Sequence, residues 1–150
     1  MKSTVDSKIL AMLMRHGRAS WSDLAKHVRL SPPAAAERVR KLEEQGIIRG
    51  YAALVDAGLA GYPLVAFVAM TLDRPHQRKG FLARLNRIQE IVECHHVAGE
   101  YDYLLKVRAQ GTLDLDRILS EELKSIPGVA RTVTTIALST WKESVEIPIR

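Results

Sequence analysis

The chain has 150 residues, of which 47% are hydrophobic and 26% are charged. This length and composition predict one or two ordinary globular domains and exclude a disordered chain. The longest uncharged apolar run, residues 57–72, is interrupted by Gly58, Gly61 and Pro63, so we expect no membrane span. The first residues lack the apolar core of a signal peptide, and the single cysteine, Cys94, has no partner for an internal disulfide. We therefore expect a cytoplasmic protein.

The net charge of +5 is concentrated in the first part of the chain. Residues 1–60 carry ten Lys/Arg against six Asp/Glu, whereas residues 61–150 carry twelve against eleven. A basic first part beside a nearly neutral second part favours contact with a polyanion. A solvated basic surface would give the same numbers, so charge alone leaves both interpretations open.

The first part of the chain predicts three short helices. The first ends near Gly17, and the second begins at Ser20, a good N-cap residue with an acid three positions later. The third begins at Ser31, whose following prolines suit a first helical turn, and it ends at Gly46. Each helix carries an apolar stripe at spacings of three and four residues. The stripes are Ile9, Leu10 and Leu13; Trp21, Leu24 and Val28; and Ala35, Val39 and Leu42.

The second and third helices are joined by the tight segment 28–31, which is typical of a helix-turn-helix unit. In such a unit the N-terminal part of the later helix enters the major groove of DNA. A three-helix bundle that binds protein would show the same pattern, with Arg38, Arg40 and Lys41 as an ordinary solvated face. The side chains expected on the open side of the third helix or on its flanks are Pro33, Ala34, Glu37, Arg38 and Lys41.

The start of this recognition helix has few hydrogen-bonding side chains. Residues 32–36 are proline and alanine, which can touch a thymine methyl group and little more. Arg38 could read a guanine or hold a phosphate, and Glu37 could accept from a cytosine or orient Arg38. Arg49, with Arg29 and Arg40, is better placed for phosphate contacts. We expect DNA shape and phosphates to matter as much as bases. The candidate DNA-binding residues are Ser31, Pro33, Ala34, Glu37, Arg38, Arg40, Lys41 and Arg49.

Residues 47–54 predict a short extended segment, and the glycine and proline residues near 55–62 indicate a hinge. After Pro63 the pattern becomes β-α-β-β-α-β. The strands are predicted at 64–72, 91–97, 103–109 and 129–138. One helix is marked by Phe81, Leu85 and Ile88, and the other by Leu115, Ile118, Leu119 and Leu123.

This order of elements predicts a ferredoxin-like sandwich, in which two helices cover one face of a four-stranded sheet. The fold class is therefore α+β, with a helix-turn-helix domain at 1–54, a hinge at 55–62 and a ferredoxin-like domain at 63–150. The first strand, 64–72, is apolar enough to be buried on both faces. Because the uncovered sheet face would expose apolar side chains, homodimerisation is the simplest way to bury it.

The run Cys94-His95-His96 resembles part of a metal site. On a strand only Cys94 and His96 share a face, and two ligands do not close a zinc site. His76 lies in a different segment. Cys94 also lacks an orienting acid that would make it a nucleophile. We therefore expect no metal, no cofactor and no catalytic residue.

Five stretches carry a family resemblance: Asp6-Ser7-Lys8-Ile9-Leu10, Leu30-Ser31-Pro32, 37–43, 46–51 and 93–106. Together they closely resemble the Lrp/AsnC family of leucine-responsive and asparagine-responsive regulators. The likeness covers nearly the whole chain, including the β-α-β-β-α-β pattern. It implies a winged helix-turn-helix domain that binds double-stranded DNA and a second domain that senses a small molecule, usually an amino acid. It also implies homodimers that assemble further into octamers.

The resemblance places the effector site between dimers, near the turn 99–102. A free amino acid needs N–H donors for its carboxylate and an acceptor for its ammonium, and Gly99 would allow close approach to the backbone. Asp102 could accept from the ammonium, and Tyr101 could wall the pocket. Thr134, with Thr132, could add hydroxyl contacts. A plain hairpin turn with a satisfied aspartate and ordinary sheet threonines is the alternative.

The chain departs from the family pattern at Arg29, where glycine is frequent, and in the alanines at 34–36, where larger residues are frequent. Two other functions fit the same fold. Siroheme decarboxylases resemble this family and act through histidine and arginine residues, parts that His95, His96 and Arg108 could take. An architectural DNA-binding protein would have no effector. We expect a regulator and not an enzyme.

Overall fold

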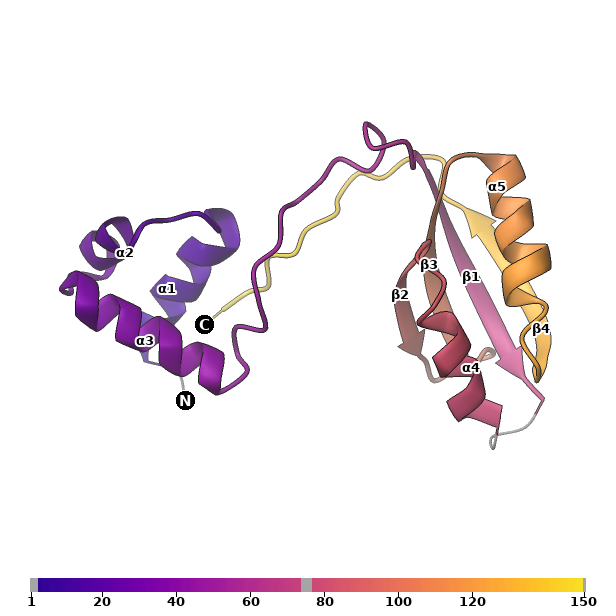
Figure 1. The fold of residues 1–150 in the computed structure, drawn as a ribbon, viewed down its shortest axis with the longest axis horizontal. Helices are drawn as coiled ribbons and strands as arrows, with labels where there is room; N and C mark the ends of the chain where they lie inside the picture. The colour runs from indigo at the N-terminus through magenta and orange to yellow at the C-terminus, as the bar shows by residue number, and fades with distance from the viewer. Residues whose placement is uncertain (1–2, 74–76, 150) are drawn as a thin grey trace. The chain divides into compact units, whose positions relative to one another are not determined.

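The computed structural model describes residues 3–73 and 77–149 (Figure 1). The chain divides into two compact units, Met1–Leu54 with Lys142–Arg150, and Val55–Trp141. The sequence predicted a second domain that continues to residue 150, whereas the structure groups the C-terminal segment with the first unit. The reason is a pair of non-local contacts: Ile149 packs against the core of the first unit, and Glu146 pairs with Arg15.

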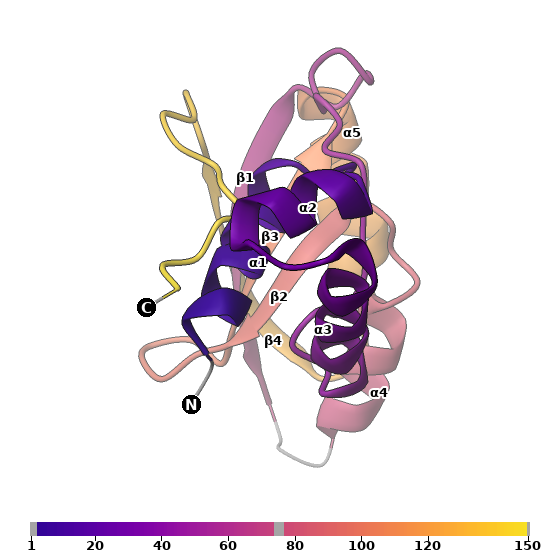
Figure 2. The ribbon, with the colours of Figure 1, turned by 90° about the vertical axis from the view of Figure 1, so that its left-hand side faces the viewer.

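The first unit contains the three predicted helices, α1 (Thr4–Arg15), α2 (Trp21–Val28) and α3 (Pro32–Glu44), seen together in Figure 2. Each begins after a serine whose side chain accepts a hydrogen bond from the backbone N–H three residues later. These serines satisfy donors that have no partner inside the helix. The predicted caps Ser20 and Ser31 are thus confirmed, and Ser3 forms a reciprocal capping box with Asp6.

The core of the first unit is the apolar stripe of each helix, as predicted. One predicted member is wrong: the side chain of Trp21 is 50% exposed. Trp21 is the first residue of α2, so no earlier turn of the same helix lies beside it. The buried residues are Ile9, Leu10, Leu24, Ala25, Val28, Ala35, Val39 and Leu42.

The turn between α2 and α3 contains a left-handed residue that is not glycine. Arg29 has φ 58° and ψ 47°, and the N–H of Leu30 donates to the carbonyl oxygen of Ala25 at 2.9 Å. This is the usual way to end a helix, although glycine normally takes the left-handed position. After α3, Ile47 and Ile48 pack partly against the core. The described residues 47–54 pair with no strand, so the predicted extended segment stands without a sheet.

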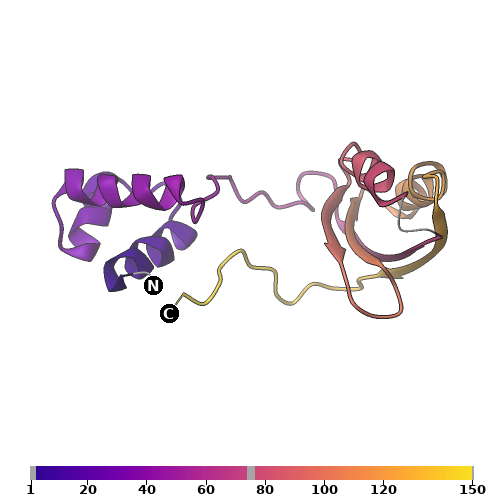
Figure 3. The ribbon, with the colours of Figure 1, turned by 90° about the horizontal axis from the view of Figure 1, so that it is seen from below.

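The second unit has the predicted order: β1 (Leu64–Leu72), α4 (Arg78–Leu85), β2 (Ile91–His96), β3 (Tyr103–Ala109), α5 (Thr112–Arg117), η2 (Ile118–Leu123) and β4 (Val129–Ile136). The sheet order is β2-β3-β1-β4, and every neighbouring pair is antiparallel. Figure 3 shows the helices on one face of this sheet. The ferredoxin-like prediction is therefore confirmed. The last helix continues from α5 into a π-helical turn, η2, which the sequence did not indicate.

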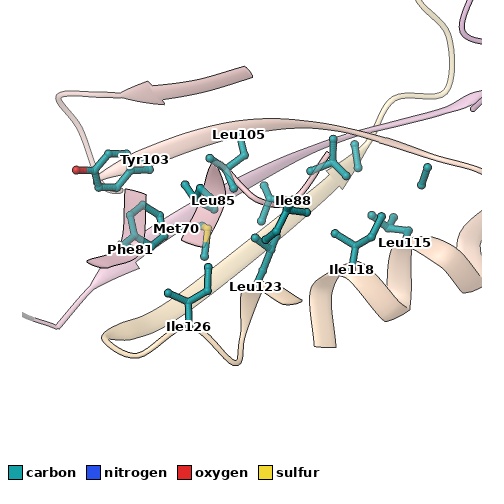
Figure 4. Close-up of a cluster of buried hydrophobic side chains, with 14 residues drawn as sticks. Met70, Phe81, Leu85, Ile88, Tyr103, Leu105, Leu115, Ile118, Leu123 and Ile126 are labelled. Carbon is teal, nitrogen blue, oxygen red and sulfur yellow. The ribbon is translucent and has the colours of Figure 1, made fainter. Parts of the chain in front are cut away.

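The core of this unit lies between the sheet and its helices (Figure 4). On β1, Ala66, Val68 and Met70 point to this side and are fully buried. On the opposite face, Phe67 is 37% exposed, so β1 is less completely buried than predicted. This face carries no helix and is called the open sheet face below. Leu85 and Ile88 contribute to the core as expected, although α4 ends before Ile88.

A stability prediction follows from Gly128, in the turn before β4. Its φ is +90°, and a Cβ built there would lie 2.1 Å from Oε1 of Gln77. Gly128→Ala should lower the unfolding free energy by about 1–3 kcal/mol, because both backbone strain and crowding oppose it. Gly80→Ala is the control, since a Cβ in this helical position meets open space. It should stabilise by about 0.5–1 kcal/mol. Urea denaturation measures the unfolding free energy of both variants. Equal changes in the two would contradict the strained and crowded position assigned to Gly128.

Candidate DNA-binding surface and effector loop

The recognition helix α3 presents a polar stripe on its exposed side. The stripe runs along the helix at spacings of three and four residues. Ala34 and Arg38 are partly buried, and therefore lie on its flank. Pro32 and Pro33 occupy the first turn, where their missing N–H groups cost nothing. The exposed predicted residues are Ser31, Pro33, Glu37, Arg40 and Lys41.

Arg38 links the recognition helix to α1. Its Nη1 donates to Oδ1 of Asp6 at 2.8 Å and to Oγ of Ser3 at 2.9 Å. Partial burial would raise the pKa of Asp6, but the hydrogen bonds from Arg38 and Ser3 outweigh it, and the pKa lies below its ordinary value. The side chains of Arg38 and Asp6 are 40% and 19% exposed, so this pair is better shielded than the others on α3. The sequence predicted a DNA contact at Arg38 and did not reveal this bridge.

The other charges of α3 pair within the helix. Arg40 bonds to Glu37 at 2.7 Å and also to Glu44, and Lys41 lies 3.7 Å from Glu37. The hydrogen bond from Arg40 lowers the pKa of Glu37. Exposed pairs of this kind contribute little to stability. Arg40 and Lys41 can therefore leave their carboxylate partners and bind phosphates at a small cost in free energy.

Two exposed arginines flank the recognition helix. Arg29 in the turn and Arg49 after the helix have no acidic partner among the residues that the structure describes. Near Arg49, the hydroxyl of Tyr51 donates to Oε1 of Glu43 at 2.8 Å, and partial burial together with Glu43 raises the pKa of Tyr51 to about 12. Tyr51 thus ties the segment after α3 back to the helix. The free guanidinium groups suit phosphate contacts.

Arg29 has a strained backbone conformation and an exposed cationic side chain, so its replacement should change stability and DNA affinity in opposite directions. Arg29→Gly should raise the unfolding free energy by about 0.5–1.5 kcal/mol, because glycine adopts the left-handed conformation without strain. The same change should weaken DNA binding and reduce the slope of log K against log salt by about 1, because one phosphate contact is lost. Thermal unfolding and anisotropy titrations at several salt concentrations measure both. Unchanged salt dependence would remove Arg29 from the phosphate contacts.

In the second unit, the turn that follows β2 is fastened to the end of β1 by Asp102. Its Oδ2 accepts from the N–H of Leu72 at 2.8 Å, and its own N–H donates to the carbonyl oxygen of Met70 at 3.0 Å. Its carbonyl oxygen accepts from the N–H of Val97 at 3.0 Å. Asp102 therefore shapes the turn, and Oδ1 is the carboxylate oxygen that this bond leaves available.

A residue that sequence reasoning missed completes this loop. Arg131 of β4 lies 5.7 Å from the ring centre of Tyr101, over its face, and 3.4 Å from Oε1 of Glu100. Its distance along the chain gave no signal; only the register that pairs β4 with β1 brings it here. A Cβ built on Gly99 meets no atom within 4 Å, so this chain leaves space beside that backbone. The loop thus joins an aromatic face, a cation and open backbone.

The predicted threonines lie on the helix-covered face of the sheet. Thr132 pairs with Met70, and Thr134 pairs with Val68. Residues directly opposite each other in an antiparallel pair point to the same face. The turn 99–102 is called the effector loop below. Since the carbonyl oxygen of Met70 accepts from the N–H of Asp102, Thr132 is closer in register to this loop than Thr134.

The Cys94-His95-His96 run alternates between faces as predicted. Cys94 and His96 lie opposite Leu105 and Tyr103 in β3, whereas His95 lies on the other face with Glu93, at 3.1 Å. Burial raises the pKa of the Cys94 thiol. Residues 3–73 and 77–149 contain no group of three potential metal ligands, and His76 lies outside the described residues. The two histidines considered for a tetrapyrrole therefore do not converge.

Within the described chain, no helix has the length and apolar character needed to cross a bilayer.

Comparison with known proteins covers both units. Residues 2–49 match a family model described as winged helix-turn-helix DNA-binding, and residues 65–147 match the Lrp/AsnC ligand binding domain. The chain belongs to the Lrp/AsnC family. The Lrp/AsnC protein is 41% identical over 142 residues to the leucine-responsive regulatory protein of Haemophilus influenzae, covering 93% of this chain and 86% of that protein. It is 39% identical over 148 residues to that of Escherichia coli K12, covering 97% and 90%.

Solved structures agree with this assignment. A transcriptional regulator from Neisseria meningitidis in complex with L-Met has a TM-score of 0.94 and 29% identity, with 99% of this chain and 97% of that chain covered. The feast or famine regulatory protein of M. tuberculosis, complexed with L-methionine, has a TM-score of 0.89 and 37% identity, with 97% of each chain covered. This Lrp/AsnC protein is a DNA-binding transcriptional regulator and not an enzyme. The decarboxylase alternative is thereby set aside.

Proposed function

We propose that this Lrp/AsnC regulator binds dyad-symmetric DNA as a homodimer and changes its DNA binding when an amino acid occupies the loop 99–102. The observation that carries the proposal is the pairing of two features in one chain: an exposed polar stripe on α3 and a loop whose aspartate keeps one oxygen available. We place the protein in the cytoplasm, where its bacterial relatives meet their DNA.

For DNA, the exposed stripe of α3 enters the major groove. Lys41, Arg40 and Arg49 supply phosphate contacts, and Glu37 is the side chain best able to read a base. Ser31, Pro33 and Ala34 form the leading end, which reads methyl groups and groove shape. Arg38 acts by holding α3 to Asp6 of α1, because its Nη1 is already engaged there.

For the amino acid, Oδ1 of Asp102 accepts from the ammonium group and the ring of Tyr101 covers the ligand. The open space beside Gly99 admits the carboxylate to the backbone. Support comes from two relatives of the same fold that were solved with L-methionine. Thr134 remains a weaker candidate than the loop residues, because its register partner is Val68 rather than Met70.

For assembly, the open sheet face supplies the surface. Three apolar side chains point to this face: Phe67, Leu104 and Val133. Leu104 of β3 and Val133 of β4 both pair with Ala69 of β1, from its two sides. An apolar surface of this kind gains free energy when a second copy covers it. The dimer then presents two recognition helices, and octamers arise from further contacts between dimers.

Selection of DNA from a random pool, followed by footprinting, tests the proposal. We expect a dyad-symmetric site whose half-sites are separated by one turn of the duplex, about 10 bp, or a multiple of it. The salt slope should correspond to several phosphate contacts. A single unpaired half-site, or binding without sequence preference, would contradict a dimeric sequence-reading regulator.

A further inference from the structure

We infer that the C-terminal segment 142–149 is a releasable strap that restrains the DNA-binding unit and carries changes at the effector loop to it. This inference rests on the proposed dimeric DNA recognition. The segment has no helix or strand, yet it groups with the helices of the first unit and not with the sheet that precedes it in sequence. The first unit is called the DNA-binding unit and the second the sensor unit. The chain passes into the sensor unit at residue 55 and returns to the DNA-binding unit at residue 142.

Ile149 and Glu146 both connect the strap to the helices. Ile149 packs against the hydrophobic core formed by α1, α2 and α3. Oε2 of Glu146 accepts from Nε of Arg15, the last residue of α1, at 3.1 Å. Within the strap, the N–H of Glu146 donates to Oγ of Ser144 at 3.0 Å, which shapes the chain just before Ile149.

The ion pair between Arg15 and Glu146 is exposed enough to be broken by a small bias. The side chains of Arg15 and Glu146 are 66% and 44% exposed, and exposed ion pairs contribute little to stability. Val145 and Ile147 are more exposed than buried and do not anchor the segment. Ile149, the apolar anchor, is itself only partly buried, and an element that exchanges between attached and released forms requires such a modest hold.

The other connection between the units, residues 49–55, has no helix or strand and leads into a hydrogen-bonded turn at the start of the second unit. Residues 56–62 form a compact turn in which Asp56 accepts from the N–H groups of Leu59 at 2.9 Å and of Ala60 at 3.0 Å. The N–H of Tyr62 donates to the carbonyl oxygen of Ala57 at 2.7 Å. A unit joined through two segments has fewer orientations than one joined through a single segment. Release of the strap therefore increases the freedom of the DNA-binding unit.

The strand that precedes the strap in the chain, β4, contacts the effector loop. Arg131 of β4 touches Glu100 and Tyr101, and the chain continues from β4 into the strap after the N–H of Ala137 donates to the carbonyl oxygen of Val65 at 2.9 Å. One continuous stretch of chain thus holds a contact to the effector loop at one end and contacts to α1 at the other. A ligand that moves Arg131 biases the strap.

The test uses the full chain and DNA selected on the parent protein, in three forms: an isolated half-site, the selected dyad, and the dyad with half a helical turn inserted. A restrained dimer should prefer the selected dyad over the inserted one by about tenfold or more, because fixed spacing raises the effective concentration of the second half-site. Ile149→Asp and Glu146→Arg should both keep half-site affinity within about twofold; Ile149→Asp should reduce the preference to below about threefold, and Glu146→Arg, which removes an exposed ion pair, should reduce it by a smaller factor. Sedimentation verifies equal assembly.

Two controls accompany these variants. Val145→Asp adds the same charge at an exposed position of the strap and should behave like the parent, as should the exchange Arg15→Glu/Glu146→Arg, which restores the ion pair. The inference is overturned if both Ile149→Asp and Glu146→Arg keep the parent's preference, if they lose half-site binding as well, or if the parent has no spacing preference. A parent that fails to bind the half-site refutes the proposed function instead.

Discussion

Arg38→Ala should weaken DNA binding by about 1–3 kcal/mol and also lower the unfolding free energy of the DNA-binding unit by about 1–3 kcal/mol. The physical reason is the bridge to α1: without the guanidinium, the carboxylate of Asp6 loses its strongest donor and α3 loses its polar link to α1. Anisotropy titration with selected DNA and urea denaturation measure the two losses.

The exchange Asp6→Arg/Arg38→Asp separates positioning from direct contact. If Arg38 positions α3, the exchanged pair should recover most of the DNA affinity and the part of the stability that the bridge supplies, while the capping bond from the N–H of Ser3 to Asp6 stays lost. If Arg38 touches DNA, the exchange should recover that part of the stability alone, because an aspartate would then face a phosphate or a guanine. Arg40→Ala is the matched control on the same helix; it should weaken DNA binding with little change in stability, since its partners are exposed.

The bridge also predicts a pH dependence. The pKa of Asp6 is lowered in the folded state, so its contribution to stability is present above the ordinary pKa of an aspartate and is lost as pH falls through the lower folded value. The difference in unfolding free energy between the parent and Arg38→Ala should therefore be constant near neutral pH and shrink in acid. A difference that persists unchanged below the folded pKa would contradict the bridge.

Asp102→Asn should abolish the amino-acid response while leaving the fold and DNA binding intact. The carboxamide oxygen can still accept from the N–H of Leu72, so the loop keeps its anchor, but the negative charge that meets the ammonium is gone. Binding of the amino acid should weaken by about tenfold or more, as expected for loss of a charge-assisted hydrogen bond. A thermal-shift titration measures the loss, because a ligand that binds the folded form raises the melting temperature.

Asp102→Ala provides the contrast. It should lose the response and also destabilise the sensor unit by about 1–3 kcal/mol, because the N–H of Leu72 is left without a partner. Asp116→Asn is a control of the same chemistry on α5, away from the loop, and should respond like the parent. A normal response in Asp102→Asn would place the ammonium elsewhere.

Local sequence patterns predicted most of the elements because the interactions that form them are local. Apolar spacing and glycine stops predicted α1, α2 and α3, with serine caps for α2 and α3, and side-chain alternation predicted that Cys94 and His96 share a face. The order of elements and the family resemblance together predicted the ferredoxin-like sheet.

The features that were missed depend on contacts between residues far apart in sequence. Arg38 meets Asp6 from 32 positions away, Arg131 meets Glu100 from 31, and Glu146 meets Arg15 from 131. No periodicity records such pairs; they follow from helix packing, strand register and the path of the chain. The sequence therefore suggested both candidate sites but did not show which side chains position the others.

We propose that an amino acid changes how this Lrp/AsnC regulator binds DNA. The most direct measurement is the dissociation constant for the selected dyad, determined by fluorescence anisotropy without ligand and with each of the twenty amino acids. We predict that at least one of them, with L-leucine and L-methionine as the first to be tried, changes the constant by about fivefold or more, the range of ordinary coupling between sites. An unchanged dissociation constant with all twenty would contradict the account.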